Sequence, residues 1–474
     1  MTPERARARV ADAAGPELLE RLDHLDALRT GGERAEEARP PAPQAGEGRD
    51  ADVSVMGGGL WLLVAPLLAA RGLRTVVLER ARAGQSHREW NASGPELRAL
   101  VRAGLLDEAT LARLVIARYD RGICRFDGGA THPVTDVLDH AVDAGALLEH
   151  ARAACEARGV RILDEHTVLS HSTSRDGARV RARGPGGTIE LSALVLVDAR
   201  GAASPFASAD LVCPTVGGVL GGLAEGDGPD VVDPRVGEIL ATVDGIDAGR
   251  QHVWEAFPGR PGETTVYLFY YAHASERTSL AELYARFFDT LSTFKRGDAR
   301  LLRPTFGFIP GWSRLTPAPR SGDPRIVLVG DAAARHSPLT YCGFGATLRS
   351  LERCADAVLE RVTGVPAREA CAVDDAPIHA LTGILAHVMA SRAFGGDELN
   401  RLLDAAFASL GELGDDVYGA LLRDEMRPRD FTRFLRRTAS RHPQVWGEVM
   451  RGLGPWTLGR WSLGVARRAL GGSA

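Results

Sequence analysis

Three consecutive glycines, Gly57, Gly58 and Gly59, follow the short apolar run at residues 53–55, and Glu79 comes about twenty residues later. A glycine turn in this context brings backbone N–H groups and a helix N-terminus to a dinucleotide pyrophosphate, and the acidic residue binds ribose hydroxyls. The spacing predicts that these four residues bind a dinucleotide. The alternative is a tight turn between strand and helix that holds no ligand.

The glycine turn departs from the usual Gly-x-Gly-x-x-Gly pattern at its last position, where Leu62 stands next to Trp61. The missing glycine normally lets helix and strand pack closely. We therefore expect Leu62 to widen that gap and Trp61 to point away from the pyrophosphate. Pro66 removes a further backbone donor from the first turns of the helix. These changes predict weakened cofactor affinity.

A second signal is Gly330-Asp331, which ends the apolar run at 325–329 and precedes a loop with Gly343 and Gly345 and a helical run. In flavoproteins of the hydroxylase and reductase type, such an acid bonds the ribityl chain. The next helix N-terminus faces the flavin pyrimidine edge and stabilises negative charge there. An enzyme that uses only NAD needs no such element, so the two signals together predict FAD. Without the first signal, Asp331 would as readily be a helix cap.

Arg88 follows the second predicted strand, where flavoproteins of this shape often bring an arginine toward the FAD pyrophosphate. We therefore include Arg88 among the expected cofactor-binding residues. The alternative is a solvated charge on a loop.

The elements that would hold these residues follow a strand–helix–strand pattern over residues 52–79, with further buried strands predicted at 191–198 and 325–329. Ligands bind at the carboxyl ends of strands in open parallel sheets, so we expect these ends to converge on one ligand. Residues 266–271, rich in tyrosine, predict a separate sheet that either lines an apolar pocket or belongs to the core.

At 474 residues, the chain is longer than a single hydrophobic core usually supports. The expected class is α/β (α+β), with a Rossmann-like FAD-binding domain around a parallel sheet, a mixed or antiparallel substrate sheet, and a helical C-terminal region. The expected divisions are 1–50 (a helix at 16–29 and a flexible linker at 31–49), 51–212 (FAD-binding domain, first part), 213–304 (substrate sheet), 305–365 (FAD-binding domain, second part) and 366–474 (helical region).

Composition argues against several classes of function. The net charge is -4 and no Lys/Arg tract carries interleaved aromatics, which argues against nucleic acid as a partner. The six cysteines lack the spacing of a zinc site or a disulfide framework, so we expect no metal and a reducing cytoplasm. No apolar stretch reaches the length of a membrane-spanning helix, and any membrane contact is expected to be peripheral.

The C-terminal tail is the segment best suited to such a contact. Tryptophans and leucines alternate there with arginines, a mixture typical of an interfacial segment on an anionic membrane. The alternative is that the tryptophans dock on the protein's own body. The residues concerned are Trp456, Leu458, Trp461 and Leu463, beside Arg460, Arg467 and Arg468.

Several blocks of this sequence resemble the CruA/CruP-type lycopene cyclases, and their order along the chain matches as well. The resemblance extends from about residue 16 to the C-terminal helices. The blocks are Arg88-Glu-Trp-Asn91, Cys213-Pro-Thr-Val-Gly-Gly218, Trp254-Glu-Ala-Phe-Pro-Gly-Arg260, Phe306-Gly-Phe-Ile-Pro-Gly311, and Gly330-Asp-Ala-Ala333 with Ser337-Pro-Leu-Thr-Tyr-Cys-Gly-Phe-Gly345.

The resemblance implies cyclisation of lycopene end groups to β-rings, an isomerisation that uses reduced FAD, with NAD(P)H only as an indirect reductant. The substrate would be a long apolar polyene. Protonation of an alkene needs an acid whose pKa is raised in an apolar pocket, with aromatic or negative density to stabilise the cation.

Glu255 is the first candidate for this acid, because Trp254 and Phe257 flank it. Glu263 is the second. The alternatives are an ion-paired or surface glutamate for Glu255, and a solvated turn after Pro261 for Glu263.

Two other functions stay open. One is a redox flavoenzyme, a reductase or monooxygenase, that acts on an isoprenoid or another apolar substrate on the same scaffold. The other is a non-catalytic relative that lost FAD affinity through Trp61 and Leu62. The sequence leaves the oligomeric state undetermined.

Overall fold

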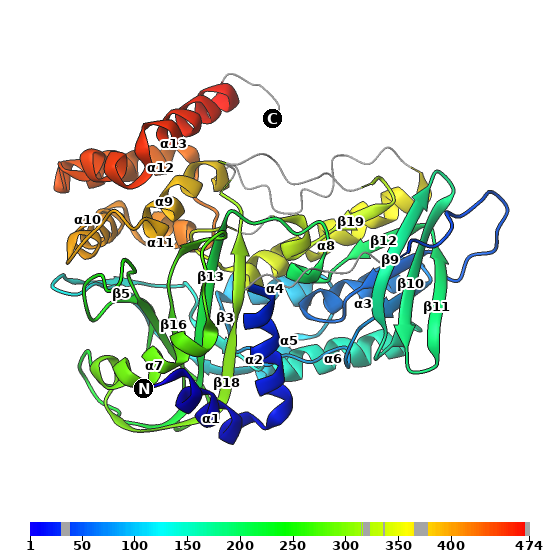
Figure 1. The fold of residues 1–474 in the computed structure, drawn as a ribbon, viewed down its shortest axis with the longest axis horizontal. Coiled ribbons are helices and arrows are strands. Elements are labelled where there is room, and N and C mark those ends of the chain that lie inside the picture. Colours follow the sequence, from blue (N-terminus) through cyan, green and yellow to red (C-terminus); the bar gives the residue numbers. More distant parts are fainter. Residues whose placement is uncertain (30–37, 314, 316–322, 335–336, 365–377, 470–474) are drawn as a thin grey trace.

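The computed structural model describes residues 1–29, 38–313, 315, 323–334, 337–364 and 378–469, with the backbone alone for 379–380 and 464–469. A parallel sheet and a larger mixed sheet lie side by side, and helices from the C-terminal part of the chain pack at one end of the larger sheet (Figure 1). This arrangement confirms the predicted fold class.

The parallel sheet contains the strands that the sequence predicted to end at the ligand. It is five-stranded, and Met56 pairs with both Leu78 and Asp198, so the carboxyl ends lie in register. In four of the five strands both faces are buried, as expected for apolar runs in a parallel sheet, whereas the edge strand at Arg161–Leu163 is partly exposed. The order is β19 (Ile326–Leu328), β12 (Val195–Asp198), β1 (Val53–Met56), β2 (Thr75–Leu78) and β8 (Arg161–Leu163).

The turn after β1 differs from the predicted helix. It continues as the 3-10 helix η1 (Leu60–Val64), and the α-helix α3 begins only at Ala65 and ends at Ala70. Trp61 and Leu62 are buried in the core beside the sheet. Pro66 lies in the first turn of α3, where its missing N–H would have no helical partner anyway. Helices α6 (Ala144–Ala157) and α8 (Gly343–Thr363) pack against η1.

The second sheet is eight-stranded and mixed, because β14 pairs with β5 in parallel and its other pairings are antiparallel. Two of its strands precede residue 213 and so lie outside the range 213–304 where the substrate sheet was expected. The order is β17 (Ala272–His273), β13 (Leu211–Leu223), β16 (Glu263–Phe269), β15 (Val253–Pro258), β14 (Val236–Ala241), β5 (Arg121–Arg125) and β6 (Thr131–Val134), and β18 (Gly297–Gly311) also pairs with β13.

One face of this sheet is covered by α7 (Leu280–Phe294) and by two N-terminal helices, α1 (Pro3–Ala14) and α2 (Pro16–Arg29). Helix α2 has the predicted bounds, whereas α1 was not predicted. Along β16, Val266 and Leu268 face this core, whereas Tyr267 and Phe269 face the opposite side. The aromatic run therefore serves both the core and a pocket wall, on alternate residues.

Two three-stranded sheets complete the body. One contains β3 (Trp90–Ala92), β7 (His140–Val142) and β4 (Val115–Arg118), beside helices α4 (Gly94–Arg102) and α5 (Glu108–Leu114). The other contains β11 (Gly187–Ala193), β10 (Gly177–Gly184) and β9 (Thr167–Ser174). Short 3-10 turns η2 (Gly201–Ala203) and η3 (Gly330–Ala333) follow β12 and β19.

The segment expected to be a flexible linker is held against β9 over its described part. The Ser170, Ser172 and Ser174 hydroxyls donate to the carbonyl oxygens of Ala38, Pro41 and Pro43. Low hydrophobicity predicted flexibility, but these hydrogen bonds fix an extended backbone that has little to bury. The linker residues at 31–37 lie outside the described part of the chain.

The C-terminal region is helical as predicted, from residue 378 onward. Its last helix is bent at Gly454, where φ is 72° and Pro455 follows. No helix in the described ranges is long and apolar enough to cross a membrane. The helices are α9 (His379–Ala390), α10 (Glu398–Leu413), α11 (Asp415–Leu422), α12 (Pro428–Arg441) and α13 (Val445–Ala469).

Candidate functional site

A cavity of about 1690 Å³ connects the carboxyl ends of the parallel sheet with the aromatic face of the mixed sheet and with the C-terminal helices. Single small-molecule sites have volumes of roughly 300–1000 Å³, so this space can accept two ligands side by side. The predicted site residues that line it are Gly57, Gly58, Gly59, Glu79, Arg88, Gly330, Asp331, Gly343, Gly345 and Glu255.

The glycine turn is held by Glu79. Its two carboxylate oxygens accept hydrogen bonds from the backbone N–H of Gly58 at 2.7 Å and of Ala81 at 3.0 Å. A carboxylate has about four acceptor positions, so two remain for ribose hydroxyls. Gly57, with a φ of 116°, lies so close to β12 that a Cβ would be 2.5 Å from the Ala199 carbonyl oxygen. The turn thus has the close backbone approach that a pyrophosphate cradle requires.

Adjacent glycines of this turn are expected to respond differently to substitution. A Cβ on Gly58 would lie 2.6 Å from the Ala83 Cβ, whereas one on Gly59 would have nothing within 4 Å. We expect Gly58→Ala to lower the free energy of unfolding by about 1–3 kcal/mol. Gly59→Ala should leave the melting temperature unchanged but weaken FAD binding, because its methyl group projects into the cavity. Thermal melts and FAD titrations of both variants measure this; equal melting temperatures would contradict it.

Asp331 and the N-terminus of α8 form the second part of the dinucleotide end. A Cβ on Gly201, which follows β12, would lie 3.4 Å from the Asp331 Oδ2, so the ends of β12 and β19 meet there. Ala334 and Tyr341, on either side of the connecting loop, have φ values of 50° and 51°. Non-glycine residues in this left-handed region are strained and concentrate at ligand sites.

Gly345 has a packing role that the sequence did not reveal. A Cβ there would lie 2.2 Å from the Glu96 Oε1. Glu96 is buried, forms an ion pair with Arg349 of α8, and caps α4 through the backbone N–H of Ser93. The absence of a side chain at Gly345 therefore lets α4 and α8 approach each other at the cavity wall.

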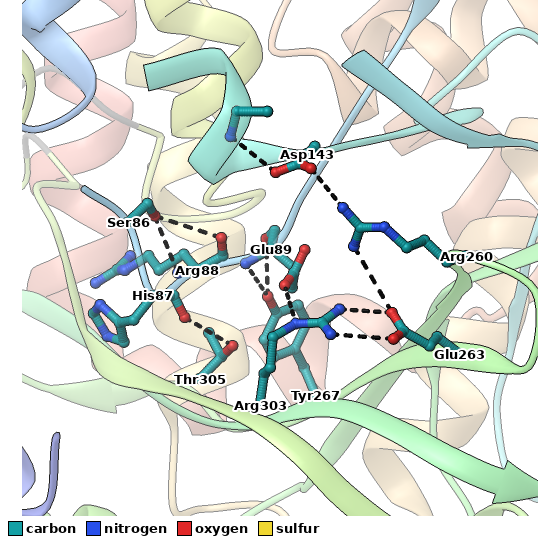
Figure 2. A network of polar contacts seen from close by, with 11 residues as sticks. Ser86, His87, Arg88, Glu89, Asp143, Arg260, Glu263, Tyr267, Arg303 and Thr305 are labelled. Carbon is teal, nitrogen blue, oxygen red and sulfur yellow. Dashed lines mark hydrogen bonds and ion pairs between the residues drawn. The ribbon is translucent and has the colours of Figure 1, made fainter. Parts of the chain in front are cut away.

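Arg88 is placed by a backbone that is bound on both sides. Its N–H donates to the Ser86 Oγ at 3.0 Å, and the Thr305 hydroxyl donates to the His87 carbonyl at 3.0 Å. Figure 2 shows the Arg88 guanidinium beside His87, pointing away from the ion pairs around Arg303. It lies over Gly307 of β18, where a Cβ would be 2.6 Å from its terminal nitrogen. Arg88 thus lines the same cavity as the glycine turn.

Glu255 lies at the other part of the cavity, in β15 and directly opposite Tyr267 of β16. Burial raises the pKa of Glu255 to about 7, although the Asn91 side chain works in the opposite direction. The Asn91 amide donates to the Glu255 Oε1 at 2.9 Å. Near neutral pH this carboxyl group therefore exists in both protonated and ionised forms, which suits a proton donor.

Tyr267, Phe269 and Tyr271 line the same cavity as this carboxyl group. Phe257, Tyr267, Phe269 and Tyr271 belong to one buried cluster on the cavity side of the mixed sheet. The Tyr267 hydroxyl donates to the Glu89 carbonyl at 2.9 Å and the Tyr271 hydroxyl to the Leu339 carbonyl at 2.5 Å. With the hydroxyls engaged by the backbone, the ring faces are what the wall offers to a ligand, and such faces stabilise cations.

Two expectations about the acid are corrected by the structure. Trp254 does not flank the Glu255 carboxyl group, because neighbouring strand residues face opposite sides; it stacks on Phe294 in the core, with ring centroids 4.8 Å apart. Glu263 does not line the cavity. Its hydrogen bond to Arg303 lowers its pKa, and the ion pair measures 2.6 Å (Figure 2). Glu263 is therefore unsuited to donate a proton.

The hydrogen bond between Asn91 and Glu255 was not predicted from the sequence, although both residues lie in blocks that resemble the CruA/CruP-type cyclases. The same holds for Trp90, which stacks on Phe344 at the start of α8 with centroids 4.7 Å apart. Residues 88–91 thus contribute side chains to both parts of the cavity. In the sequence, only the resemblance of this block to the cyclases pointed to it.

No model of a protein family matches the sequence, and no curated protein matches it. Solved structures do. A geranylgeranyl bacteriochlorophyll reductase-like protein from Thermoplasma acidophilum superposes with a TM-score of 0.56 at 15% identity, over 84% of this chain and 98% of that one. The chain therefore shares the fold of this reductase-like protein.

Two further solved structures support this assignment of the fold. The halogenase PltM in complex with phloroglucinol and FAD has a TM-score of 0.57 at 14% identity, over 90% of this chain and 93% of that one. The p-nitrophenol 4-monooxygenase PnpA from Pseudomonas putida DLL-E4 has a TM-score of 0.52 at 17% identity, over 84% and 98%. At identities this low, the superpositions establish a shared fold only, and the reaction has to be argued from the site.

Proposed function

We propose that the protein binds FAD at the dinucleotide end of the cavity. The residues present fit this cofactor: Gly57 and Gly58 leave room only for backbone, Glu79 keeps acceptor positions for ribose, and Asp331 lies where two strand ends meet. The long helix α8 begins at Gly343 on the cavity wall, so its N-terminus supplies partial positive charge. The halogenase PltM, which shares the fold and was solved in complex with FAD, is consistent with this proposal.

We further propose that the protein is a lycopene cyclase that acts on an apolar polyene. The observation that carries this proposal is the Glu255 carboxyl group, whose pKa is raised to about 7 within an aromatic wall of the same cavity. A polar substrate would need several polar partners there, whereas the wall offers ring faces and aliphatic side chains. The resemblance of five sequence blocks to CruA/CruP-type cyclases supports the same substrate class.

The chain's own residues account for the acid step. The protonated Glu255 carboxyl gives its proton to the terminal double bond of the substrate, and the resulting carbocation closes the ring on the neighbouring double bond. One ring proton is then released to water, which restores the proton balance and leaves an isomer of the substrate. Tyr267 and Phe269 present ring faces to the cation. The Asn91 amide stabilises the carboxylate left behind. When bound, reduced FAD would supply negatively charged, electron-rich density that stabilises a cation.

Removal of the Asn91 amide should move the pH dependence of the reaction. Because the hydrogen bond from Asn91 lowers the pKa of Glu255, Asn91→Ala should raise it further. The rate falls as Glu255 ionises, so the falling limb of the rate profile should shift to higher pH in the variant. Cyclisation rates measured from pH 5 to 9 test this. A limb that stays in place would show that Asn91 does not control the ionisation of the acid.

The proposed function is tested by producing the protein in a bacterial host that accumulates lycopene, with pigment extraction and a flavin spectrum of the purified protein. Monocyclic or bicyclic carotene together with bound FAD supports the proposal. Unchanged lycopene with no bound flavin refutes it and favours a non-catalytic relative.

The second candidate is a redox flavoenzyme that acts on an isoprenoid or other apolar substrate. It is favoured by the reductase-like and monooxygenase neighbours that share the fold. Such an enzyme consumes NAD(P)H in step with product, whereas a cyclase needs a reductant only to charge the flavin. Stoichiometric loss of NAD(P)H would therefore select this candidate.

We also propose peripheral attachment to an anionic membrane through α12 and α13. On α13, Trp456 is 86% exposed and Leu463 is 61% exposed, although Trp461 of the same helix lines the cavity. Residues 423–474 contain eleven arginines and only four acidic residues, although the net charge of the whole chain is -4. Exposed apolar residues with excess positive charge suit an interfacial segment.

Vesicle binding tests this attachment. Wild-type protein should sediment with vesicles that contain phosphatidylglycerol and much less with neutral phosphatidylcholine. The double variant Trp456→Ser, Leu463→Ser should lose at least roughly tenfold in binding, since each buried side chain contributes about 1.5–3 kcal/mol. Leu302→Ser, an exposed leucine on β18, is the matched control. Equal binding of the double variant and the control would reject the assignment.

A further inference from the structure

The N-terminal helix α2 lies against the dinucleotide end of the cavity, although it precedes the first strand of the parallel sheet by more than 20 residues. Arg21 and His24 of this helix line the cavity together with the glycine turn. The inference below rests on the proposal that FAD is the cofactor and is independent of the cyclase reaction.

Helix α2 is held rigidly. Its Asp26 carboxylate accepts hydrogen bonds from the first turn of α7, from the Leu280 N–H at 2.7 Å and from the Ser279 hydroxyl at 2.8 Å. The Arg29 guanidinium donates to the carbonyl oxygens of Ala274 and Glu276, at 2.9 Å and 2.8 Å. A helix fixed by these bonds keeps Arg21 at a defined place on the cavity wall.

Arg21 meets two further arginines there, Arg80 after β2 and Arg88 over Gly307. Among the described residues, none of these three guanidinium groups has a hydrogen-bond or ion-pair partner. The nearby carboxylate is Glu79, and both of its oxygens already accept backbone N–H groups of the turn. Three permanent cations therefore share one cavity wall with one nearby carboxylate, Glu79, whose negative charge raises the pKa of Arg21 and offsets only part of their repulsion.

The effect of this positive charge is seen on two groups. Partial burial, together with Arg80 and Arg88, lowers the pKa of Arg21 to about 10, although its side chain stays accessible at the mouth of the cavity. Burial, together with Arg21 and Arg88, lowers the pKa of His87 to about 3. His87 is thus neutral and its Nε2–H donates to the Phe306 carbonyl at 3.0 Å. A bound anion would relieve the repulsion between the arginines.

The glycine turn is followed by a short helical segment that begins as a 3-10 helix, not by a long α-helix. The segment after it is a five-residue 3-10 helix, and α3 has only six residues. A long helix N-terminus at this point would contribute about half a positive charge. Arg21 of α2 and the two loop arginines line the same cavity and can add positive charge to that of the short helical segment.

We propose that the N-terminal helix is part of the cofactor site, and that Arg21, together with Arg80 and Arg88, binds the pyrophosphate of FAD beside the short helical segment that follows the glycine turn. The chemistry recognised is a pyrophosphate diester with two negative charges, which guanidinium groups bind through charge-assisted hydrogen bonds. Asp26 acts as a positioning residue, because it fixes the helix that carries Arg21.

The test is a fluorescence titration of the apo-protein with FAD, which needs no substrate and no turnover. Arg21→Gln should raise the Kd for FAD by roughly 10-fold to 100-fold, and Arg21→Lys should recover part of the loss. Asp26→Ala should weaken FAD binding as well, although Asp26 does not line the cavity. Arg5→Gln, on the exposed side of α1, is the matched control and should bind like wild type.

Salt and a second nucleotide separate the outcomes. Wild-type affinity for FAD should fall more steeply between 50 mM and 500 mM NaCl than the affinity of Arg21→Gln, because one ionic contact is missing in the variant. An unchanged Kd for FAD in Arg21→Gln overturns the proposal, and so does an effect confined to titrations with NADPH. A protein that binds FAD through Arg21 but leaves lycopene unchanged would refute the cyclase function alone.

Discussion

Glu255→Gln should abolish cyclisation while the protein stays folded and binds FAD. Glutamine keeps the shape and can accept the Asn91 hydrogen bond, but it has no proton to give. Removal of a general acid typically costs about 10²–10⁴-fold in rate. In wild type the rate should fall above pH 7, because burial places the pKa of Glu255 at about 7 and the acid must be protonated. Carotene formation and its pH profile measure both effects.

The same variant should be more stable than wild type at pH 8. The pKa of Glu255 in the folded protein, about 7, lies above its ordinary value of 4.5, so the unfolded chain ionises first. Stability conferred by the neutral carboxyl is present below pH 4.5 and is lost as pH rises through 7. The difference corresponds to about 3 kcal/mol at most.

Glu263→Gln, which breaks an ion pair outside the cavity, is the control and should keep its activity. A loss of activity in Glu263→Gln equal to that in Glu255→Gln would contradict the assignment.

Glu79→Gln should weaken FAD binding about as strongly as Glu79→Ala, by roughly 100-fold. Both carboxylate oxygens accept backbone N–H groups, at 2.7 Å from Gly58 and 3.0 Å from Ala81. An amide has only one oxygen, so its NH₂ group must face one of these donors. The turn should then lose its shape as well as a ribose contact. FAD titrations and melting temperatures report the two losses separately.

The control for this variant is Glu149→Gln, which changes an exposed ion pair with Arg82 on the outer side of α6. Surface pairs of this kind contribute about 0–1 kcal/mol, and FAD affinity should be unchanged. If Glu79→Gln bound FAD like wild type, the carboxylate would not hold the turn in the way described.

The dinucleotide end was predictable because its signals are local. Buried apolar runs predicted β1, β2 and β19, and glycines or acids mark their ends in the sequence. The form of the turn after β1 was not predictable in the same way. The usual helix could not form against the sheet with Trp61 and Leu62 in the core, and a 3-10 segment replaces it.

The proton-donor end depends on contacts between distant segments. Glu255 and Asn91 lie 164 residues apart, and Glu263 and Arg303 lie 40 apart, so no local pattern reveals that one glutamate is a cavity acid and the other an ion pair. Strand alternation could have shown that Trp254 faces away from Glu255. The role of Arg21 was also hidden, since it depends on where α2 docks.

The most direct test of the central claim is the mass of the product formed from lycopene by the purified, FAD-loaded protein in D₂O, with NAD(P)H followed in parallel. Acid-catalysed cyclisation predicts a carotene with one deuterium for each ring formed, and no NAD(P)H consumed in proportion to product. Glu255→Gln should yield none. A product that gains two hydrogens or an oxygen, with matching loss of NAD(P)H, would contradict the account and identify a redox enzyme.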